Sequence, residues 1–455
     1  MFFCDDTIIA QCTPRGPGAL ALIRLVGAQA FICAEKISKM PDDKKISSCL
    51  THTIEYGKIV DAAGAIIDNV LFFLMRAPRT FTGHDTVEIT CHNNQFIIEG
   101  IIEAAILQGA RVAYPGEFSQ RAVLAGKYDL IQAEAINELI HAQTQQGLKQ
   151  SLLQLQGTLS VVIESIEKKL ILALALTEAS FEFLDDEIEF APRIFSLISE
   201  VRAMIAPLKE SFAYQQQIRT GMRIALLGSV NAGKSSLFNI LVGTERTIVS
   251  ACAGTTRDAI EASLYQNGMH ITFVDTAGLR ETGDQIEREG MKKSYEQAAC
   301  ADIILLVYDM SRPLTHQESL FYTSLFEQYC NKILVVANKS DVASEMCQFL
   351  KQPDCSVSTF DKSGIDHLSH LITQKITHFF GTTACPFLLN ARQHNLIIHC
   401  DRELTELSDR FEQKPHYELI AHHLTVSIAH LGELTGKTVS EAAMNAVFRE
   451  FCVGK

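Results

Sequence analysis

Residues 228–235 (GSVNAGKS) combine glycine, lysine and serine in the G-x-x-x-x-G-K-S spacing of a phosphate-binding loop. A short apolar stretch precedes this segment and an amphipathic stretch follows it, as expected for a strand and a helix. Gly228 and Gly233 allow the backbone to curl until its N–H groups face a polyphosphate. The Lys234 ammonium group is then expected to reach the β- and γ-phosphates, and the Ser235 hydroxyl to reach a Mg²⁺ ion.

Three further polar segments follow in the order and spacing of a small GTPase domain. Thr256 in a TTRD segment is expected to close over the γ-phosphate, and Asp275 in a DTAG segment to hold Mg²⁺ through water. In the NKSD segment, the Asp341 carboxylate accepts two N–H bonds from guanine that adenine does not offer in that arrangement. Asn338 and Lys339 are expected to brace the base and the phosphate loop. Four such segments in sequence predict a guanine-nucleotide domain rather than four unrelated polar turns.

The DTAG segment lacks the glutamine with which many GTPases position the attacking water. Leu279 stands at that position, and its apolar side chain cannot orient water. Three nearby carboxylates, on Glu281, Asp284 and Glu287, offer a replacement, but a solvated loop explains the same charges. No arginine can be assigned to the transition-state charge, so a monovalent cation beside the phosphates is a further candidate.

The composition is that of a soluble globular protein of two or three domains, with 455 residues of which 47% are hydrophobic. The net charge of −13 excludes a global basic field, so any contact with RNA must use a local patch or a partner. Thirteen cysteines without C-x-x-C pairs favour a reducing compartment. No apolar run is long enough to span a bilayer, and the N-terminus has no charged signal region. We expect a cytoplasmic protein without membrane contact.

The elements that must position these residues follow from hydrophobic periodicity. The first 120 residues read as mixed α and β, with strands at 19–26, 54–60, 66–75, 86–91 and 111–113 and helices at 28–38 and 95–107. Apolar residues then recur at helical spacing from residue 130 almost to residue 183. Further helices are predicted at 119–125, 192–219, 390–412, 418–432 and 440–451.

Amphipathic helices therefore flank the nucleotide domain on both sides, and each flank needs a place to bury its apolar face. One helical domain with the nucleotide domain inserted in it is the economical arrangement, and two separate helical modules are the alternative. The predicted domains are residues 1–118 (α+β), 119–220 (helical, first part), 221–380 (GTPase, a Ras-like parallel-sheet α/β domain) and 381–455 (helical, second part).

The chain resembles the MnmE (TrmE) family of tRNA-modification GTPases almost end to end. A C-x-G-K ending behind an inserted GTPase domain is the most specific feature. The motifs that carry the resemblance are residues 6–10 (DTIIA), 81–83 (FTG), 115–119 (PGEFS), Lys127 with Asp129, 132–135 (QAEA), 229–236 (SVNAGKSS), 253–258 (AGTTRD), 275–280 (DTAGLR) and 452–455 (CVGK).

The resemblance implies a homodimer whose N-terminal domain resembles folate-binding domains and dimerises. It implies potassium-stimulated GTP hydrolysis and a FAD-dependent partner, MnmG (GidA), in a heterotetramer. Together the two proteins install an aminomethyl or carboxymethylaminomethyl group at C5 of the wobble uridine U34 of certain tRNAs. A tetrahydrofolate derivative, 5-formyl or 5,10-methylene, carries the one-carbon unit. The alternative is a regulatory GTPase of ribosome assembly without modification chemistry, which would need neither the N-terminal domain nor the C-x-G-K tail.

The resemblance also assigns roles to individual positions. Glu287 aligns with the family's water-positioning glutamate. Cys452 could act as a nucleophile or an acid, although a cysteine between Phe451 and Val453 is also typical of plain packing. The predicted potassium ligands are Asn231, Ser250, Cys252 and Thr255, and the folate contacts are Arg24, Glu88, Lys127 and Lys455. The predicted GTP contacts are Asn231, Ala232, Gly233, Lys234, Ser235, Ser236, Ser250, Thr255, Thr256, Asp275, Thr276, Ala277, Gly278, Asn338, Lys339, Asp341 and Ser358.

The sequence departs from the family pattern at four places. Asn93 and Asn94 stand where relatives usually have two glycines, and His84 stands where an acid is common. Val230 takes the place of the proline that usually precedes the asparagine of the phosphate loop. Thr359 replaces the usual alanine of the last guanine-contact loop, which weakens the predicted base contact there. None of these changes removes a main catalytic group.

Overall fold

The structure, a computed structural model, describes residues 6–182, 190–212, 215–243, 260–266, 269–275, 294–342, 352–381, 387–410 and 416–454. The chain forms two compact units. One contains residues 1–137, 153–206 and 391–455, and the other contains residues 138–152 and 207–390. Within the described ranges, none of the helices has the length and apolar character needed to cross a membrane.

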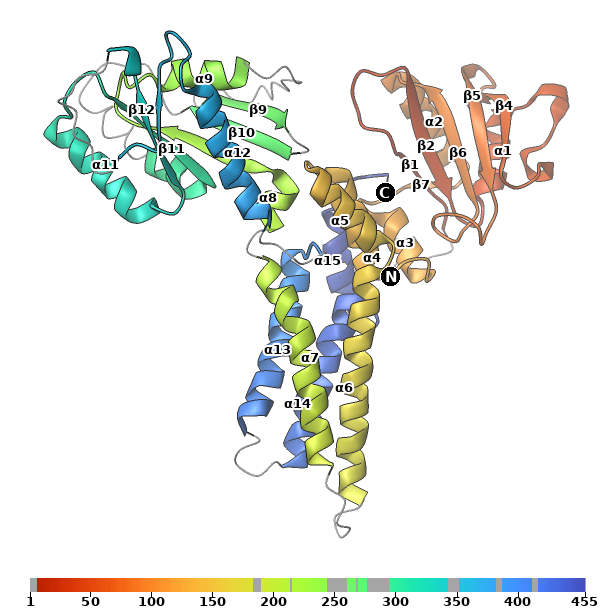
Figure 1. Ribbon diagram of the computed structural model, residues 1–455. Helices are drawn as coiled ribbons and strands as arrows, with labels where there is room; N and C mark the ends of the chain where they lie inside the picture. Colours follow the sequence, from red (N-terminus) through yellow and green to blue (C-terminus); the bar gives the residue numbers. More distant parts are fainter. Residues whose placement is uncertain are drawn as a thin grey trace. The chain divides into compact units, whose positions relative to one another are not determined.

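The first unit begins with a seven-stranded sheet of order β3-β4-β5-β6-β2-β1-β7, drawn in red and orange in Figure 1. All neighbours are antiparallel except β1 and β7. Two helices share a buried apolar core with the sheet. The strands are β1 (Ile8–Gln11), β2 (Leu20–Val26), β3 (Ser38–Lys39), β4 (Thr53–Val60), β5 (Ile66–Met75), β6 (Thr86–His92) and β7 (Arg111–Val112), and the helices are α1 (Ala30–Lys36), η1 (Pro41–Asp43), η2 (Ile46–Ser48) and α2 (Gln95–Leu107).

The predicted hairpin of β4 and β5 is confirmed, and α2 has both of its predicted ends. The Asn94 side chain caps α2 by accepting the Phe96 N–H at 2.9 Å. The prediction for α1 is too long at both ends. The Gln29 N–H donates to the Thr7 hydroxyl instead of entering the helix, and Ser38 pairs with β4 opposite Ile59.

A short helix, α3 (Glu117–Leu124), begins two residues earlier than predicted because it is anchored at its start. The buried Glu117 carboxylate accepts from the Arg111 guanidinium at 2.5 and 2.8 Å and from Arg121 at 2.9 Å. Asp6 accepts from the same two arginines. These hydrogen bonds satisfy charges that would otherwise be costly to bury, and they fix α3 to the strand β7.

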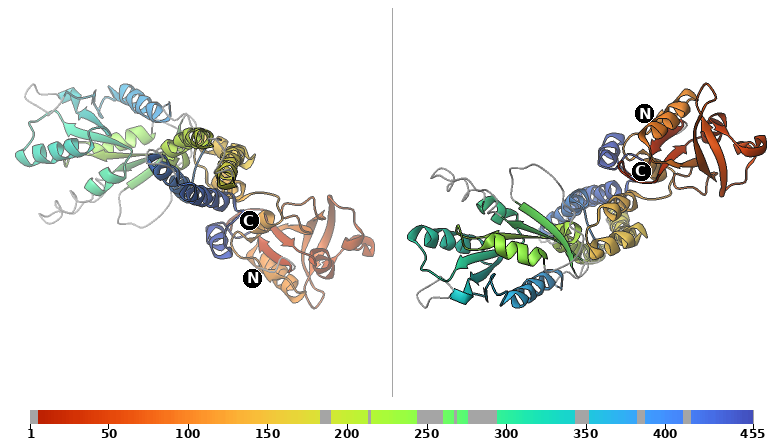
Figure 2. Two further views of the ribbon diagram at one scale, coloured as in Figure 1. Left: turned by 90° about the horizontal axis from the view of Figure 1, so that it is seen from below. Right: turned by 90° about the horizontal axis from the view of Figure 1, so that it is seen from above.

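The helices on either side of the nucleotide domain pack together, which confirms the predicted insertion. Helix α14 contacts both α6 and α13, and the left view of Figure 2 looks along these helices. Near one end, the buried Glu134 carboxylate receives two 2.8 Å bonds from Arg392, so residues 258 positions apart form one ion pair. The helices are α4 (Leu130–His141), α5 (Gln145–Leu155), α6 (Thr158–Glu182), α7 (Ala191–Ser211), α13 (Ala391–Arg410), α14 (Tyr417–Thr435) and α15 (Glu441–Arg449).

The predicted single helix over residues 192–219 is wrong, because α7 is followed by a separate helix, α8 (Gln215–Thr220). Partners inside the second unit hold α8. The Thr144 hydroxyl bonds the Ile218 carbonyl, and the Arg219 carbonyl accepts the Gln143 N–H at 3.1 Å. The Arg219 side chain pairs with Glu138 at 2.8 Å. These contacts depend on residues some 75 positions earlier, which the periodicity of residues 192–219 does not reveal.

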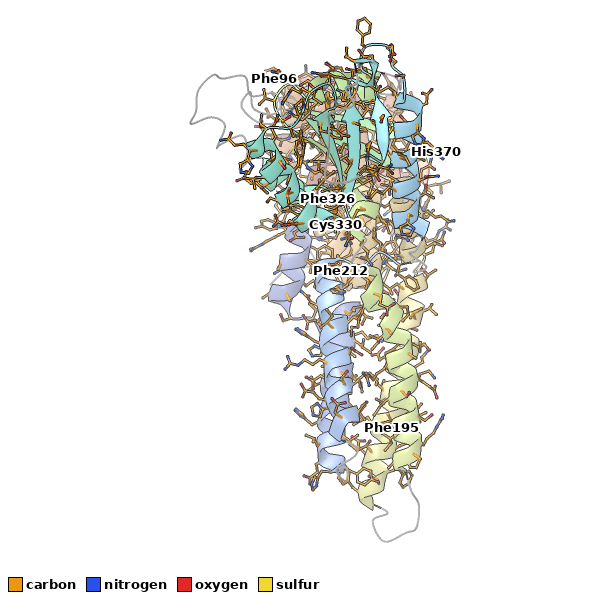
Figure 3. The ribbon with its side chains drawn as sticks, turned by 60° about the vertical axis from the view of Figure 1, so that its left-hand side comes forward. Phe96, Phe195, Phe212, Phe326, Cys330 and His370 are labelled. Atoms are coloured by element: carbon orange, nitrogen blue, oxygen red, sulfur yellow. The ribbon has the colours of Figure 1, made fainter. Side chains whose placement is uncertain are left out.

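The second unit contains a six-stranded sheet of order β13-β12-β11-β8-β10-β9. Only the edge strand β9, which was not predicted from the sequence, is antiparallel to its neighbour. Helices cover both faces: in Figure 3, Phe326 marks α11 and His370 marks α12, with the sheet between them. The elements are β8 (Met222–Leu227), α9 (Lys234–Gly243), β9 (Ile260–Gln266), β10 (Met269–Asp275), β11 (Ile303–Asp309), α11 (His316–Tyr329), β12 (Ile333–Asn338), η4 (Ser340–Val342), β13 (Cys355–Val357) and α12 (Ile365–Gly381).

Candidate functional site

Polar segments follow the carboxyl ends of five parallel strands in the second unit. The loop of residues 228–233 follows β8, and Asp275 and Asn338 end β10 and β12. Asp309 ends β11, and Ser358 follows β13. Because the carboxyl ends of parallel strands meet at one edge of a sheet, these residues gather where α/β folds bind ligands.

The loop after β8 has the backbone that a phosphate requires. Gly233 has a φ of +89°, and a β-carbon there would lie 2.1 Å from the Asn338 Nδ2 atom. Asn231, which is exposed, adopts a left-handed φ of +63°. Helix α9 then begins at Lys234, and the N–H groups of its first turn have no carbonyl within the helix to bond. Ser235 lies in that turn with an exposed side chain, so a polyphosphate and its Mg²⁺ fit this end of α9.

The Lys234 side chain is buried and folds back onto the loop. Its Nζ atom donates to the carbonyls of Gly228 at 3.0 Å and Ser229 at 2.8 Å. Burial lowers the pKa of Lys234, and the buried Asp275 carboxylate acts in the opposite direction. An arriving phosphate would offer this ammonium group a stronger partner than two carbonyl oxygens.

The base-reading segment is tied to the loop at the next strand. The Asn338 side chain is fully buried and donates from Nδ2 to the Ala232 carbonyl at 2.8 Å. Lys339 has a left-handed φ of +64°, and Asp341 is exposed. Ser358 is buried, and its hydroxyl accepts the Phe360 N–H at 3.2 Å. The structure thus brings Asn338, a predicted GTP contact, onto the loop. Val357 in β13 is the register partner of Asn338, and Ser358, another predicted contact, follows Val357 directly.

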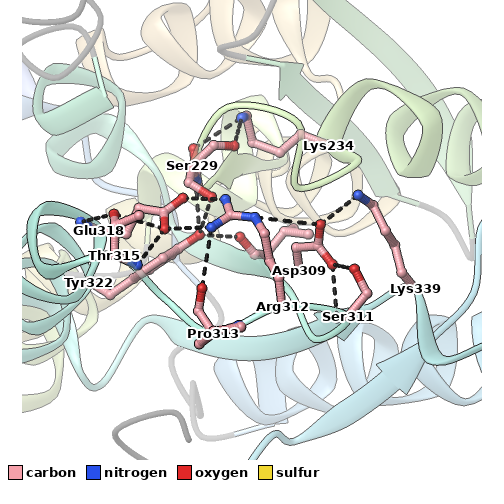
Figure 4. A network of polar contacts seen from close by, with 12 residues as sticks. Ser229, Lys234, Asp309, Ser311, Arg312, Pro313, Thr315, Glu318, Tyr322 and Lys339 are labelled. Carbon is pink, nitrogen blue, oxygen red and sulfur yellow. Dashed lines mark hydrogen bonds and ion pairs between the residues drawn. The ribbon is translucent and has the colours of Figure 1, made fainter. Parts of the chain in front are cut away.

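A polar network that was not predicted from the sequence lies beside these residues (Figure 4). The Lys339 ammonium group bonds Asp309 at 2.5 Å, and the Arg312 guanidinium forms two bonds to Glu318 at 2.6 and 2.9 Å. The Arg312 guanidinium lowers the pKa of the Glu318 carboxyl to about 2. Thr315 and Glu318 form a capping box at the start of α11, a signal that the T-x-x-E spacing carries in the sequence. No local pattern marks Tyr322, whose hydroxyl reaches Ser229.

In the first unit, two of the four predicted folate contacts form an ion pair. Arg24 on β2 and Glu88 on β6 are register partners, and Arg24 Nε lies 2.7 Å from Glu88 Oε1. Both side chains are 18% exposed. The Arg24 guanidinium also stacks over the rings of Phe81 and Phe118, with 5.5 and 5.4 Å to the centroids. Lys127, in contrast, points its Nζ atom to the Pro78 carbonyl at 2.5 Å.

The C-terminal residues lie against the start of the same sheet. The Gly116 N–H donates to the Cys452 carbonyl at 3.3 Å. Gly454 has a φ of +96°, and a β-carbon there would lie 2.3 Å from the Gln11 carbonyl oxygen. Gln11 adjoins Ala10, the register partner of Arg24. The chain end therefore reaches the strand next to Arg24, and the Cys452 side chain is exposed rather than part of a core.

Ser236, another predicted GTP contact, lies exposed in the first turn of α9. The remaining predicted site residues lie outside the described ranges. They are Ser250, Cys252, Thr255, Thr256, Thr276, Ala277, Gly278, Glu287 and Lys455. Within the described residues, no group of three or more histidine, cysteine, aspartate or glutamate side chains is arranged to hold a metal ion.

Comparison with known proteins gives concordant matches over almost the whole chain. Residues 7–127 match the family model "GTP-binding protein TrmE N-terminus", and residues 130–452 match "MnmE helical domain". The tRNA modification GTPase MnmE of Chlorobium phaeobacteroides is 34% identical over 463 residues, which cover 99% of this chain and 97% of that protein. The proteins of the same name from Acetivibrio thermocellus and Lachnoclostridium phytofermentans are 35% and 36% identical, and each match covers 99% of both chains.

Proposed function

The chain belongs to the MnmE family of tRNA modification GTPases, GTP hydrolases that use GTP and Mg²⁺. From this membership we propose that it helps install an aminomethyl or carboxymethylaminomethyl group at C5 of the wobble uridine U34 of tRNA. A tetrahydrofolate derivative, 5-formyl or 5,10-methylene, supplies the one-carbon unit when bound. A FAD-dependent MnmG (GidA) partner completes a heterotetramer with a homodimer of this chain.

The meeting of the two chain ends carries this proposal. Gly454 packs on the Gln11 carbonyl, one position along β1 from the register partner of Arg24. Lys455 follows directly in the sequence, and in this proposal Lys455 and Lys127 are the cationic partners of the folate carboxylates. The Arg24–Glu88 ion pair meets the ligand as one unit, in which Glu88 offers an acceptor for pterin N–H groups and Arg24 a donor beside it. The Phe81 and Phe118 rings under Arg24 give the site an apolar wall. A pure nucleotide switch needs no such arrangement.

In this proposal the GTP site consists of the loop of residues 228–233 and the carboxyl ends of the parallel strands in the second unit. Lys234 and the first turn of α9 bind the phosphates, and Asp341 reads guanine. Ser235 and Thr256 hold Mg²⁺, and Asp275 holds it through water. Asn231, Ser250, Cys252 and Thr255 hold a potassium ion, and Glu287 positions the attacking water in place of the missing glutamine. Asn231 is exposed and has a left-handed backbone, so its side-chain oxygen is available to a cation. This supports Asn231 as one of the potassium ligands.

GTP turnover in potassium is expected to exceed turnover in sodium by about tenfold or more, since one added cation contributes at least ~1.4 kcal/mol of charge stabilisation. Asn231→Ala should remove most of that difference.

Glu287→Ala should bind GTP with unchanged affinity and hydrolyse it about 100-fold more slowly. Phosphate release at saturating GTP measures both effects. Equal rates in the two salts would refute the potassium assignment, and wild-type turnover by Glu287→Ala would refute the role of that glutamate.

The outer face of the N-terminal sheet supports the proposed homodimer. Ile54 and Tyr56 on β4 and Leu71 on β5 project from one face, because Tyr56 is the register partner of Leu71 and Ile54 lies two residues away. Their side chains are 60%, 55% and 40% exposed. An exposed apolar patch on a sheet is typical of a protein interface. Sedimentation at micromolar concentration should give a dimer that Tyr56→Glu converts to a monomer, whereas a monomeric wild-type chain would contradict the proposal.

A further inference from the structure

Tyr322 is the largest fully buried side chain in the described part of the protein, yet its hydroxyl group is at the phosphate-binding loop. Its oxygen lies 2.8 Å from the Ser229 backbone nitrogen and 3.2 Å from the Ser229 hydroxyl oxygen. The same oxygen lies 2.9 Å from the Val307 carbonyl oxygen in β11. One phenol therefore joins the loop after β8 to the neighbouring strand.

The proton count fixes the direction of these bonds. A phenol carries one proton and two acceptor lone pairs, and the Val307 carbonyl can only accept, so the proton goes to Val307. The Ser229 N–H then donates to the Tyr322 oxygen. The Ser229 hydroxyl also bonds Glu318, and this bond contributes to the lowered pKa of that carboxyl. Burial raises the pKa of Tyr322, which keeps the donated proton in place at neutral pH.

The residue held in this way is the one that holds the phosphate lysine. The Ser229 carbonyl accepts a bond from Lys234 Nζ, together with the carbonyl of Gly228. Gly228 packs closely against the same two groups, because a β-carbon there would lie 2.0 Å from the Val307 oxygen and 3.3 Å from the Tyr322 hydroxyl. The first two residues of the loop thus have their orientation set from α11 and β11.

We propose that Tyr322 is a positioning residue for the phosphate-binding loop. Its hydroxyl holds the Ser229 peptide in the orientation from which Lys234 and the loop N–H groups meet the phosphates. Without that hydroxyl, the Ser229 N–H loses its partner and the loop must be ordered again each time a nucleotide binds. The ordering cost then appears in the affinity for phosphates. This inference rests on the proposed nucleotide-binding role of the loop.

Tyr322→Phe tests it, because the ring still fills the core and only the hydroxyl is lost. Leaving a buried N–H and carbonyl unpaired should weaken GDP and GTP binding about tenfold. Guanosine, which has no phosphate, should compete with a fluorescent GDP equally well against variant and wild type. The matched control is Tyr295→Phe, which removes a 2.8 Å bond from a tyrosine to Ser324 on the same α11 without touching the loop. It should leave GDP affinity within about twofold of wild type.

Each outcome is informative about a different claim. A fall in GDP affinity with unchanged guanosine affinity supports the positioning role. An equal fall for GDP and guanosine, or no fall for GDP, overturns it. If Tyr295→Phe lowers GDP affinity as much as Tyr322→Phe, the effect is a general loosening of α11 and the inference is wrong. A wild-type chain that fails to bind GDP would instead refute the proposed nucleotide site itself.

Discussion

Replacing Lys234 with methionine is expected to weaken GTP binding by about 1,000-fold while leaving the midpoint of chemical unfolding no lower than that of the wild-type protein. The two effects have opposite causes. The bound phosphates lose a buried charge partner. The nucleotide-free fold instead loses a buried cation whose burial costs more than its two carbonyl bonds and the Asp275 carboxylate return. Methionine is of similar length and carries no charge.

The sign of the stability effect follows from the lowered pKa of Lys234. A lysine whose pKa is lower in the folded than in the unfolded state destabilises the fold wherever it is protonated. The resulting loss in the free energy of unfolding is complete below the pKa that Lys234 has in the folded state. It disappears as the pH rises towards the value of 10.5 in the unfolded chain. Urea titrations without nucleotide, together with isothermal titration of GTP, measure both effects.

Lys332→Met is the matched control, because the Lys332 ammonium group also bonds a carbonyl, that of Ala301 at 2.9 Å, but away from the loop. It should bind GTP like the wild type. A Lys234→Met protein that unfolds well before the wild type, or that keeps its GTP affinity, would contradict the account of this lysine.

Replacing Gly454 with alanine should abolish wobble-uridine modification and leave GTP turnover within about twofold of wild type. The added β-carbon would lie 2.3 Å from the Gln11 carbonyl, a distance that side chains do not adopt, so the chain end must leave the sheet. The residue also has a φ of +96°, which alanine adopts at a cost of about 1–2 kcal/mol. Mass analysis of nucleosides from cells that carry only the variant measures the loss.

Gly109→Ala separates the two causes, since Gly109 has the same φ of +96° in the first unit and open space where its β-carbon would lie. We expect the Gly109→Ala protein to keep the modification.

Cys452→Ser tests whether the exposed thiol acts chemically. Loss of the modification in a protein whose tail is correctly placed would favour a nucleophile or acid. Full modification by Gly454→Ala would mean that the chain end plays no part in the chemistry.

The sequence predicted the parts of the site that depend on short-range pattern. The loop glycines and Lys234 follow a buried strand and Asn338 ends another, and parallel strands must bring such residues to one edge. The insertion of the nucleotide domain was predictable for a similar reason, because both flanks carry apolar faces that only another helix can cover. The ion pair of Glu134 and Arg392 shows how the two flanks meet.

The parts that the sequence could not predict depend on contacts between distant residues. Tyr322 and Ser229 are 93 positions apart, and a tyrosine on an amphipathic helix looks like ordinary core. The sequence predicts Arg24 and Glu88 only as two of four folate contacts, but the register of β2 and β6 makes them an ion pair that a ligand must approach as a unit. Helix α8 was merged with α7 because the partners that hold its end lie before α6 in the chain.

The central claim is that this GTPase serves the chemistry of a tRNA base through a site where the two ends of the chain meet. Mass analysis of wobble nucleosides in cells that lack this chain tests it most directly. We predict that uridine U34 is left without its aminomethyl or carboxymethylaminomethyl group at C5, and that the intact chain restores it. An unchanged nucleoside profile would contradict the claim and favour a regulatory GTPase, for instance one acting in ribosome assembly.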